Sequence, residues 1–275
     1  MEFILNNKVS IPAIGFGTWQ LTDNVEKVIT QAIQANYKHI DTAAVYGNEA
    51  AIGSALKNAT INREDIFITS KVWNTNRGYQ NTLNAFEESL TKLQTNYLDL
   101  YLIHWPVKNS ENNWEQLNAE TWRALEYLYK QGKVRAIGVS NFLVHHLESL
   151  LDNCEIKPMV NQIEYHPGYT QNETVIYCKA NDILVEAWSP IGSGKLLQNE
   201  TLLKIAAKYN VTVAQLCIQF ALQNNILPLP KSTNPVNIVS NIQFSSFVIS
   251  IDDMKILNGM DETGFSGLLP DLVAF

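Results

Sequence analysis

Short hydrophobic runs alternate with amphipathic segments along almost the whole chain. Runs such as IFITSK at 66–71, DLYLIHW at 99–105 and ILVEAWSP at 183–190 are nearly continuous and rich in Ile, Val and Leu. Runs of this kind are typical of strands buried on both faces, as in a parallel sheet. About eight such strands are expected, beginning near Ile14, Tyr37, Ile66, Asp99, Val134, Met159, Ile183 and Leu227.

The segments between these runs carry helical periodicity. In residues 79–93 apolar side chains recur at steps of three and four, which places them on one helix face: Tyr79, Leu83, Phe86, Leu90 and Leu93. Two further helical patterns, at 202–209 and 213–223, precede the last strand. Parallel strands need crossover connections of this length, so each strand is expected to be followed by a helix.

About eight strand–helix units predict an α/β fold, a (β/α)8 TIM barrel. Residues 3–10 are expected to form an N-terminal β-hairpin with its turn at Asn6–Asn7. The alternative, an open doubly wound sheet, would normally carry GxGxxG after its first strand, whereas residues 13–19 read AIGFGTW. No linker-like stretch interrupts the chain, so residues 1–275 are predicted to form one domain.

Charge and cysteine content narrow the class of protein. The formal net charge of −7, with 20 basic against 27 acidic residues, argues against a nucleic-acid partner. The three cysteines, Cys154, Cys178 and Cys217, are widely spaced, which favours idle thiols in a reducing compartment over a metal or disulfide framework. Neither a signal-peptide pattern nor a membrane-length apolar stretch is present, so a cytoplasmic location is expected.

Four ionisable residues stand at or just after the ends of successive predicted strands. Asp41 ends the second strand and Tyr46 follows it, while Lys71 ends the third strand and His104 the fourth. In a barrel the active site is built at the C-terminal ends of the strands. Ionisable groups next to buried strands cost free energy unless they are paired, so these four residues are predicted to form a catalytic site.

The chemistry that suits this group is carbonyl reduction. A hydride delivered to a carbonyl carbon leaves charge on the oxygen, which then needs a proton. Tyr46 is predicted to be the general acid, and Lys71 is expected to lower its pKa from about 10 by favouring phenolate. Asp41 would keep Lys71 charged, and His104 would hydrogen-bond the substrate oxygen.

Other chemistries fit these residues less well. A glycosidase would use two carboxylates, for which Asp41 and Glu49 could serve, but Lys71 would then have no role. A metal site would need more clustered ligands, and none is predicted. His145 and His146 are adjacent, do not share a helix face, and are expected on a surface helix.

Long ordered segments resemble the aldo-keto reductase superfamily over essentially the whole chain: HIDTAAVYGNE at 39–49, ITSKVW at 68–73, LDLYLIHWP at 98–106, KVRAIGVSNF at 133–142 and PLPKST at 228–233. The chain is most similar to the short-tailed prokaryotic branch that includes diketogluconate reductases. The resemblance implies a barrel with a hairpin lid and the tetrad described above. It also implies reduction of aldehydes or ketones with NADPH as the cofactor, and no metal. The oligomeric state stays open, with a monomer as the default expectation.

The resemblance also implies the cofactor and substrate residues. Ser140, Asn141 and Gln162 match residues that bind the nicotinamide carboxamide, and Trp188 matches the aromatic on which the ring stacks. The full set of implied cofactor residues is Thr18, Ser140, Asn141, Gln162, Trp188, Ser189, Ile191, Gly192, Lys231, Ser232, Thr233, Asn234 and Asn241. The implied walls of the substrate pocket are Trp19, Trp73 and Trp105, with loops 106–114 and 264–275 setting specificity.

The chain departs from the family at one cofactor position. Where the family usually has Pro-x-Arg-Ile-x-Glu-Asn, residues 235–241 read PVNIVSN, so Asn237 replaces the Arg and Ser240 the Glu. A weaker preference for NADPH over NADH is therefore expected. Two other function classes stay open: a non-catalytic binding module, like the potassium-channel β subunits of this superfamily, and a barrel hydrolase or lyase that needs no nicotinamide.

Overall fold

The computed structural model describes residues 1–59, 61–106, 113–243 and 247–273, and its centre is a sheet of eight parallel strands. The strands pair in chain order from first to last. They are β3 (Phe16–Gly17), β4 (His39–Asp41), β5 (Phe67–Val72), β6 (Leu98–Ile103), β7 (Val134–Ser140), β8 (Val160–Glu164), β9 (Leu184–Trp188) and β10 (Leu227–Pro228). Every strand begins within two residues of its predicted start.

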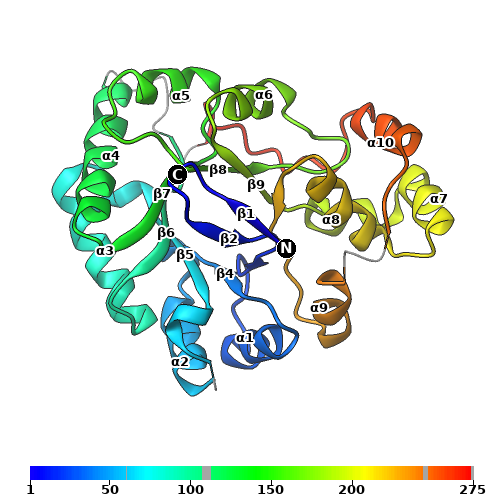
Figure 1. The fold of residues 1–275 in the computed structure, drawn as a ribbon, viewed down its shortest axis with the longest axis horizontal. Helices are drawn as coiled ribbons and strands as arrows, with labels where there is room; N and C mark the ends of the chain where they lie inside the picture. Colours follow the sequence, from blue (N-terminus) through cyan, green and yellow to red (C-terminus); the bar gives the residue numbers. More distant parts are fainter. Residues whose placement is uncertain (60, 107–112, 244–246, 274–275) are drawn as a thin grey trace.

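Backbone hydrogen bonds close this sheet into a barrel. The amide of Gly15 donates to the carbonyl of Pro228 at 3.1 Å, and the amide of Gly17 donates to that of Pro230 at 3.0 Å. A Cβ atom on residue 17 would lie 2.9 Å from the Leu229 carbonyl oxygen, so glycine permits the close approach of the first and last strands. The predicted (β/α)8 barrel is confirmed, and the sheet forms its centre in Figure 1.

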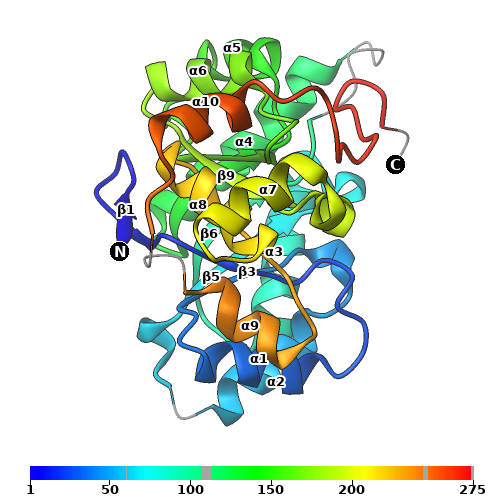
Figure 2. The ribbon, with the colours of Figure 1, turned by 90° about the vertical axis from the view of Figure 1, so that its right-hand side faces the viewer.

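Helices surround the barrel, as the predicted crossovers require (Figures 1 and 2). They are α1 (Val25–Gln34), α2 (Glu49–Asn58), α3 (Tyr79–Leu93), α4 (Trp114–Lys130), α5 (Val144–Leu151), α6 (Asn172–Ala180), α7 (Glu200–Lys208), α8 (Val213–Gln223), α9 (Pro235–Asn241) and α10 (Ile251–Asn258). In α3 the predicted apolar face is buried at Phe86, Leu90 and Leu93. No described helix is both long and apolar enough to span a membrane.

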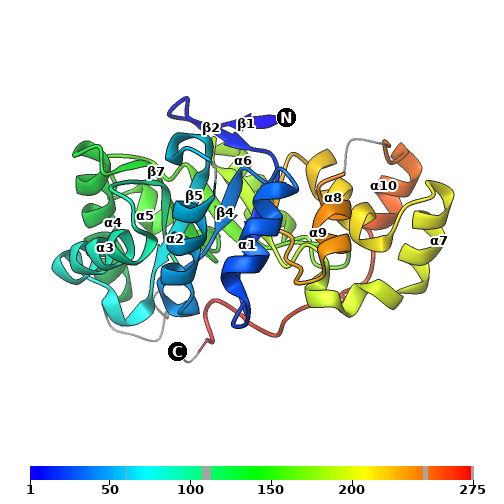
Figure 3. The same ribbon diagram turned by 90° about the horizontal axis from the view of Figure 1, so that it is seen from below.

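The N-terminal hairpin closes the end of the barrel at which the strands begin. It consists of β1 (Glu2–Ile4) and β2 (Ser10–Pro12), which confirms the prediction. The side chain of Asn6 donates to the carbonyls of Pro158 and Asp182, and that of Asn7 donates to the carbonyl of Arg135. Figure 3 shows the hairpin and the segment that follows α10 at opposite ends of the barrel. The hairpin lid therefore covers the end away from the C-terminal strand ends.

Asp99 ties three strands together near their amino ends. Its side chain is almost fully buried on β6, and its Oδ2 accepts from the Ile68 amide at 2.9 Å and from Arg63 at 2.8 Å. Its Oδ1 accepts from Arg135 of β7 at 2.7 Å. Arg63 also lies over the ring of Tyr97, 4.0 Å from its centroid. This one carboxylate therefore joins β5, β6 and β7.

We predict that Asp99→Ala lowers the free energy of unfolding by about 1.5 to 3 kcal/mol, because hydrogen bonds to a buried charged group are lost. Urea unfolding followed by circular dichroism measures the change. Arg135→Ala is the control, because that side chain is 46% exposed and its ion pair is screened by solvent. The control should cost less than about 1 kcal/mol. Equal effects of the two substitutions would contradict the role given to Asp99.

Candidate active site

The four residues of the predicted tetrad meet at the carboxyl ends of three neighbouring strands. Asp41 is the last residue of β4, and Lys71 lies one residue before the end of β5. His104 follows β6 directly, and Tyr46 ends η1, a short 3-10 helix over Ala44–Tyr46 that comes just after β4. Because parallel neighbours place their carboxyl ends at one edge, residues far apart in sequence converge there.

Lys71 and Asp41 form a buried ion pair. The Lys71 ammonium nitrogen lies 2.8 and 2.9 Å from the two Asp41 carboxylate oxygens, and 2.9 Å from the carbonyl oxygen of Thr42. The Lys71 side chain is 0% exposed. Burial is the largest single effect and lowers the pKa of Lys71, but the charge and hydrogen bonds of Asp41, together with the other acidic groups nearby, outweigh it, and the net direction is upward. Lys71 is therefore charged at neutral pH.

Tyr46 lies against this charge. The Lys71 nitrogen is 5.2 Å from the centroid of the Tyr46 ring. Burial raises the pKa of Tyr46 above its usual value, and the positive charge of Lys71 opposes that rise without reversing it. The expectation that Lys71 brings the pKa of Tyr46 below its usual value is therefore wrong, because desolvation of the phenolate is the larger effect. The phenol keeps its proton at neutral pH.

His104 is a neutral imidazole beside the phenol. Burial, then the charges of Lys71 and Arg77, hold the pKa of His104 well below its usual range. Its ring packs edge-on against Tyr46 and Trp73, with centroids 5.5 and 5.1 Å away. A neutral histidine in this position can hydrogen-bond a substrate oxygen without giving up a proton.

Glu186 extends the site in a way that was not predicted. It lies on β9, is 0% exposed, and its Oε2 accepts a hydrogen bond from Gln162 at 2.8 Å. The same Gln162 nitrogen donates to Asp41 at 2.8 Å. The sequence contained a signal of this, because Glu186 interrupts the hydrophobic run at 183–188. Burying a carboxyl group costs free energy, so its presence there indicates a specific role.

The residues predicted to bind nicotinamide form a connected cluster at the ends of β7, β8 and β9. The Ser140 hydroxyl donates to the backbone carbonyl of Gln162 at 2.8 Å and accepts from the Asn141 amide nitrogen at 3.1 Å. The Trp188 indole donates to the Asn141 amide oxygen at 2.8 Å. Asn141 has a left-handed backbone with φ 64°, which is uncommon outside glycine and clusters at functional sites.

The remaining predicted cofactor residues apart from Thr18 lie in two loops and in helix α9. The loop after β9 contains Ser189, Ile191 and Gly192 and leads into η4, a 3-10 segment over Gly192–Gln198. The loop after β10 brings the exposed ammonium of Lys231 to 3.5 Å from the Gln20 carbonyl oxygen. The rest of that loop, Ser232, Thr233 and Asn234, leads into α9, whose last residue is the buried Asn241.

Thr18 is not placed in an open cleft. Its hydroxyl is 0% exposed and donates to the Asp41 backbone carbonyl at 2.9 Å. Thr18 therefore supports the strand that carries Asp41. Its predicted contact with a cofactor stays a prediction.

A nicotinamide dinucleotide fits the polar groups at this end of the barrel. Among the described residues no group donates to the side-chain oxygen of Gln162, which leaves an acceptor for an amide N–H. Trp188 is half-buried and offers a flat aromatic surface, and Lys231 offers an exposed positive charge for phosphate. An acceptor, an aromatic surface and a cation are the three groups that such a cofactor requires.

The three tryptophans predicted to wall the substrate pocket differ in exposure. Trp19 is 43% exposed, Trp73 is half-buried against His104, and Trp105 is buried. The segment after α10 reaches the same end of the barrel, because the amide of Ser266 donates to Glu164 of β8 at 2.9 Å. Residues 107–112 and 274–275 of the predicted specificity loops lie outside the described residues.

The sequence suggested that the adjacent histidines are simply surface residues, but they are not. His146 of α5 is buried, and both His145 and His146 direct Nε2 at one oxygen of Asp271, at 3.1 and 3.2 Å. The three potential ligand atoms lie within 4.8 Å of one another. The Leu143 amide, however, donates to Nδ1 of His146, so Nε2 carries that ring's proton and faces Asp271 as a donor. This geometry suits an anchor for the C-terminal segment better than a metal site.

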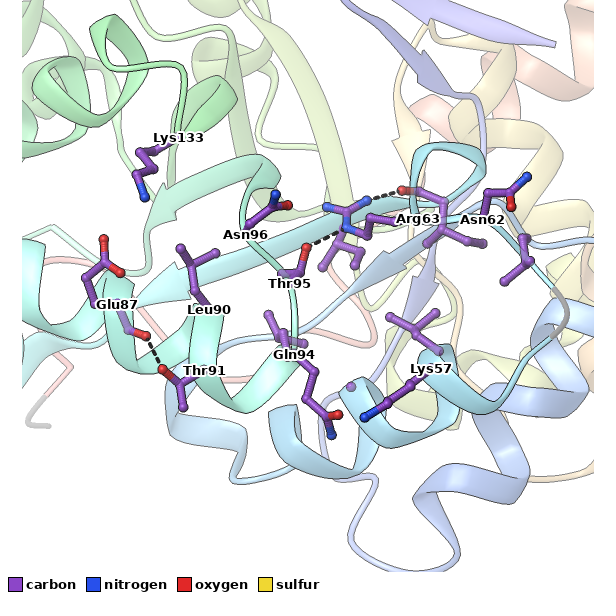
Figure 4. A pocket seen from close by; sticks show the side chains of 16 residues that line it. Lys57, Asn62, Arg63, Glu87, Leu90, Thr91, Gln94, Thr95, Asn96 and Lys133 are labelled. Carbon is purple, nitrogen blue, oxygen red and sulfur yellow. Dashed lines mark hydrogen bonds between the residues drawn. The ribbon is translucent and has the colours of Figure 1, made fainter.

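A cavity of about 800 Å³ lies elsewhere on the barrel, between α2 and α3. Its lining includes Lys57, Arg63, Glu87 and Lys133, and Figure 4 shows these side chains around it. Arg63 precedes β5 and Lys133 precedes β7, so the cavity opens near the amino ends of the strands. It contains none of the predicted site residues, and the barrel end opposite it carries the tetrad.

Comparison with known proteins identifies the family of this chain. The family model described as "Aldo/keto reductase family" matches residues 13–262. The glyoxal reductase of Bacillus subtilis is 47% identical over 273 residues, covering 98% of this chain and 96% of its own length. The solved structure of MGS-M4, an aldo-keto reductase from a deep-sea metagenome library, has a TM-score of 0.93 at 41% identity, covering 99% of this chain and 100% of its own.

A solved structure of a Gox0644 variant in complex with NADPH has a TM-score of 0.93 at 37% identity, and the match covers 100% of this chain and 99% of that one. Family model, relatives and solved structures therefore span nearly the whole chain. The chain belongs to the aldo/keto reductase family.

Proposed function

We propose that the protein reduces aldehydes or ketones to alcohols, with Tyr46 as the general acid. The observation that carries the proposal is the buried Lys71–Asp41 pair beside the Tyr46 ring, next to a neutral His104. A relative named glyoxal reductase makes glyoxal a suitable first substrate to test. A non-catalytic binding module would have no need for a charged lysine buried beside a protonated phenol.

Each of the four tetrad residues has a different role in the proposed reaction. The neutral imidazole of His104 hydrogen-bonds the carbonyl oxygen and orients it. The Tyr46 hydroxyl donates its proton to that oxygen as negative charge develops there. Lys71 stabilises the phenolate that Tyr46 becomes, and Asp41 keeps Lys71 charged and in place. A bound reduced nicotinamide supplies the hydride for the carbonyl carbon.

NADPH is the proposed cofactor, and the NADPH complex of a structural neighbour supports it. Gln162 would accept from the carboxamide, Trp188 would pack against the ring, and Lys231 would reach the 2′-phosphate. Asn237 is exposed on α9 where the resemblance leads one to expect Arg. An uncharged amide cannot offer the planar charged fork by which Arg holds phosphate, so NADH should also serve.

We further propose that the enzyme works in the cytoplasm as a monomer. Three free cysteines, of which Cys178 and Cys217 are buried, suit a reducing compartment.

Tyr46→Phe is predicted to reduce kcat for carbonyl reduction by about 10² to 10⁴-fold, because the proton donor is removed. NADPH binding, followed by quenching of tryptophan fluorescence, should stay within about twofold, since the phenol is remote from the phosphate end. Tyr101→Phe is the matched control, because the Tyr101 hydroxyl is also buried and has no partner among the described residues. A Tyr46 variant that keeps more than about a third of kcat would rule out the acid role.

Lys71→Met is predicted to slow the reaction and to raise the pKa of Tyr46 further, because the opposing positive charge is removed. Alcohol oxidation requires the phenolate, so its pH–rate profile should move to higher pH. Circular dichroism establishes that the variant is folded despite the unpaired Asp41. An active variant with an unmoved profile would mean that Lys71 has only a structural role.

Asn237→Arg is predicted to raise the NADPH-to-NADH ratio of kcat/KM by about ten- to a hundredfold, since hydrogen bonds to a charged group are worth about 1.5 to 3 kcal/mol. Asn258→Arg adds the same charge on α10 and should leave the ratio unchanged. The interpretation fails if the wild type already favours NADPH by more than about a thousandfold, equivalent to about 4 kcal/mol. It also fails if Asn237→Arg behaves like the control.

A further inference from the structure

Glu186 has a buried carboxyl group for which the proposed mechanism has no use. It lies in the middle of β9 and is 0% exposed. Its Oε2 accepts from Gln162 at 2.8 Å, while its Oε1 has no hydrogen-bond partner among the described residues. An apolar side chain would fill this position at lower cost, because burying a half-satisfied carboxyl group is unfavourable.

The contact with Gln162 fixes the orientation of an amide. The nitrogen of Gln162 donates to Asp41 Oδ2 and to Glu186 Oε2, at 2.8 Å in both cases. Both N–H groups are thereby used, and the only polar atom left on the side chain is its oxygen. Turning the amide over would place that oxygen against the Asp41 carboxylate, which repels it.

We propose that Glu186 is a positioning residue for the carbonyl reduction proposed above. It holds Gln162 so that the amide oxygen, and not the nitrogen, is presented to the cofactor. It also places a second carboxyl group beside the Lys71–Asp41 pair. The inference rests on the proposed function, and its test uses two measurements that do not require turnover.

The second carboxyl group has a consequence for Tyr46. The charged groups that face Glu186 are Asp41 from β4 and Lys71 from β5, whereas its register neighbours Gln162 and Leu227 are uncharged. Burial, and then the charge of Asp41, raise the pKa of Glu186 to about 8, against the opposing effects of Gln162 and Lys71.

Glu186 is therefore protonated and uncharged at neutral pH and ionises in mildly alkaline solution. Its negative charge then competes with the Tyr46 phenolate for the positive charge of Lys71. Ionised Glu186 should consequently raise the pH at which Tyr46 loses its proton.

Two variants separate the charge from the hydrogen bond. Glu186→Gln keeps the shape and an acceptor for Gln162 but cannot ionise. Glu186→Leu removes both the charge and the acceptor. Glu126→Gln is the matched control, because Glu126 is also a buried, hydrogen-bonded carboxylate, but it lies on α4 and binds the backbone amides of Glu155 and Ile156.

The charge is tested by titrating tyrosinate absorbance in the protein without cofactor. The signal of Tyr46 is the difference between each protein and the same protein carrying Tyr46→Phe. In Glu186→Gln the Tyr46 titration should move down by about half a pH unit or more, as expected when a nearby negative charge is lost. The control should titrate like the wild type. An unmoved titration in Glu186→Gln overturns the role of the charge.

The hydrogen bond is tested by fluorescence titration with NADPH. Glu186→Leu should raise the Kd about tenfold, because Gln162 is no longer held, whereas Glu186→Gln should stay within about twofold. An unchanged Kd in Glu186→Leu overturns the positioning of Gln162. Should Glu186→Leu fail to fold by circular dichroism, Gln162→Leu replaces it, and an unchanged Kd there has the same meaning. Neither titration requires turnover, so both give a result even if the protein reduces no aldehyde. A failure of the role proposed for Glu186 can therefore be distinguished from a failure of the proposed carbonyl reduction.

Discussion

The buried contact between Lys71 and Asp41 is the interaction on which the rest of the site depends. Taking a charged ammonium out of water costs several kcal/mol, and the attraction of one carboxylate offsets this only with good geometry and further hydrogen bonds. Both are present, because two oxygens of Asp41 and the carbonyl of Thr42 surround the Lys71 nitrogen within 2.9 Å. The positive charge of Lys71 therefore lies beside Tyr46. We propose that this charge helps Tyr46 to transfer its proton to the substrate.

The barrel provides this geometry, and the segment after α10 is held at the same end of the barrel. Ser266 binds Glu164 at the end of β8, and Asp271 binds the two histidines of α5. Next to the first of these contacts, the Lys195 ammonium of η4 donates to the Phe265 carbonyl at 2.8 Å. The segment expected to face substrate is thus joined directly to η4, which begins at the predicted cofactor residue Gly192.

The sequence predicted the fold, and it predicted that the four residues of the tetrad lie together, because both leave local signals. Strands buried on both faces appear as apolar runs, and an ionisable residue such as Lys71 or His104 at the end of a run is conspicuous. The direction of the Tyr46 pKa was predicted wrongly, because it depends on how deeply the phenol is buried. His146 contacts Asp271, and Gln162 contacts Asp41. Each contact joins residues more than a hundred positions apart in the sequence, so no local sequence pattern predicts it.

The most direct test of the account follows an isotope from cofactor to product. The protein is incubated with glyoxal and NADPH that carries deuterium at the transferable position of the nicotinamide, and the alcohol is analysed by mass spectrometry. The account predicts one deuterium on the new alcohol carbon for each NADPH oxidised, while the hydroxyl proton comes from Tyr46 and exchanges with water. An alcohol without deuterium, or no oxidation of NADPH with any of a range of reactive aldehydes, would contradict it.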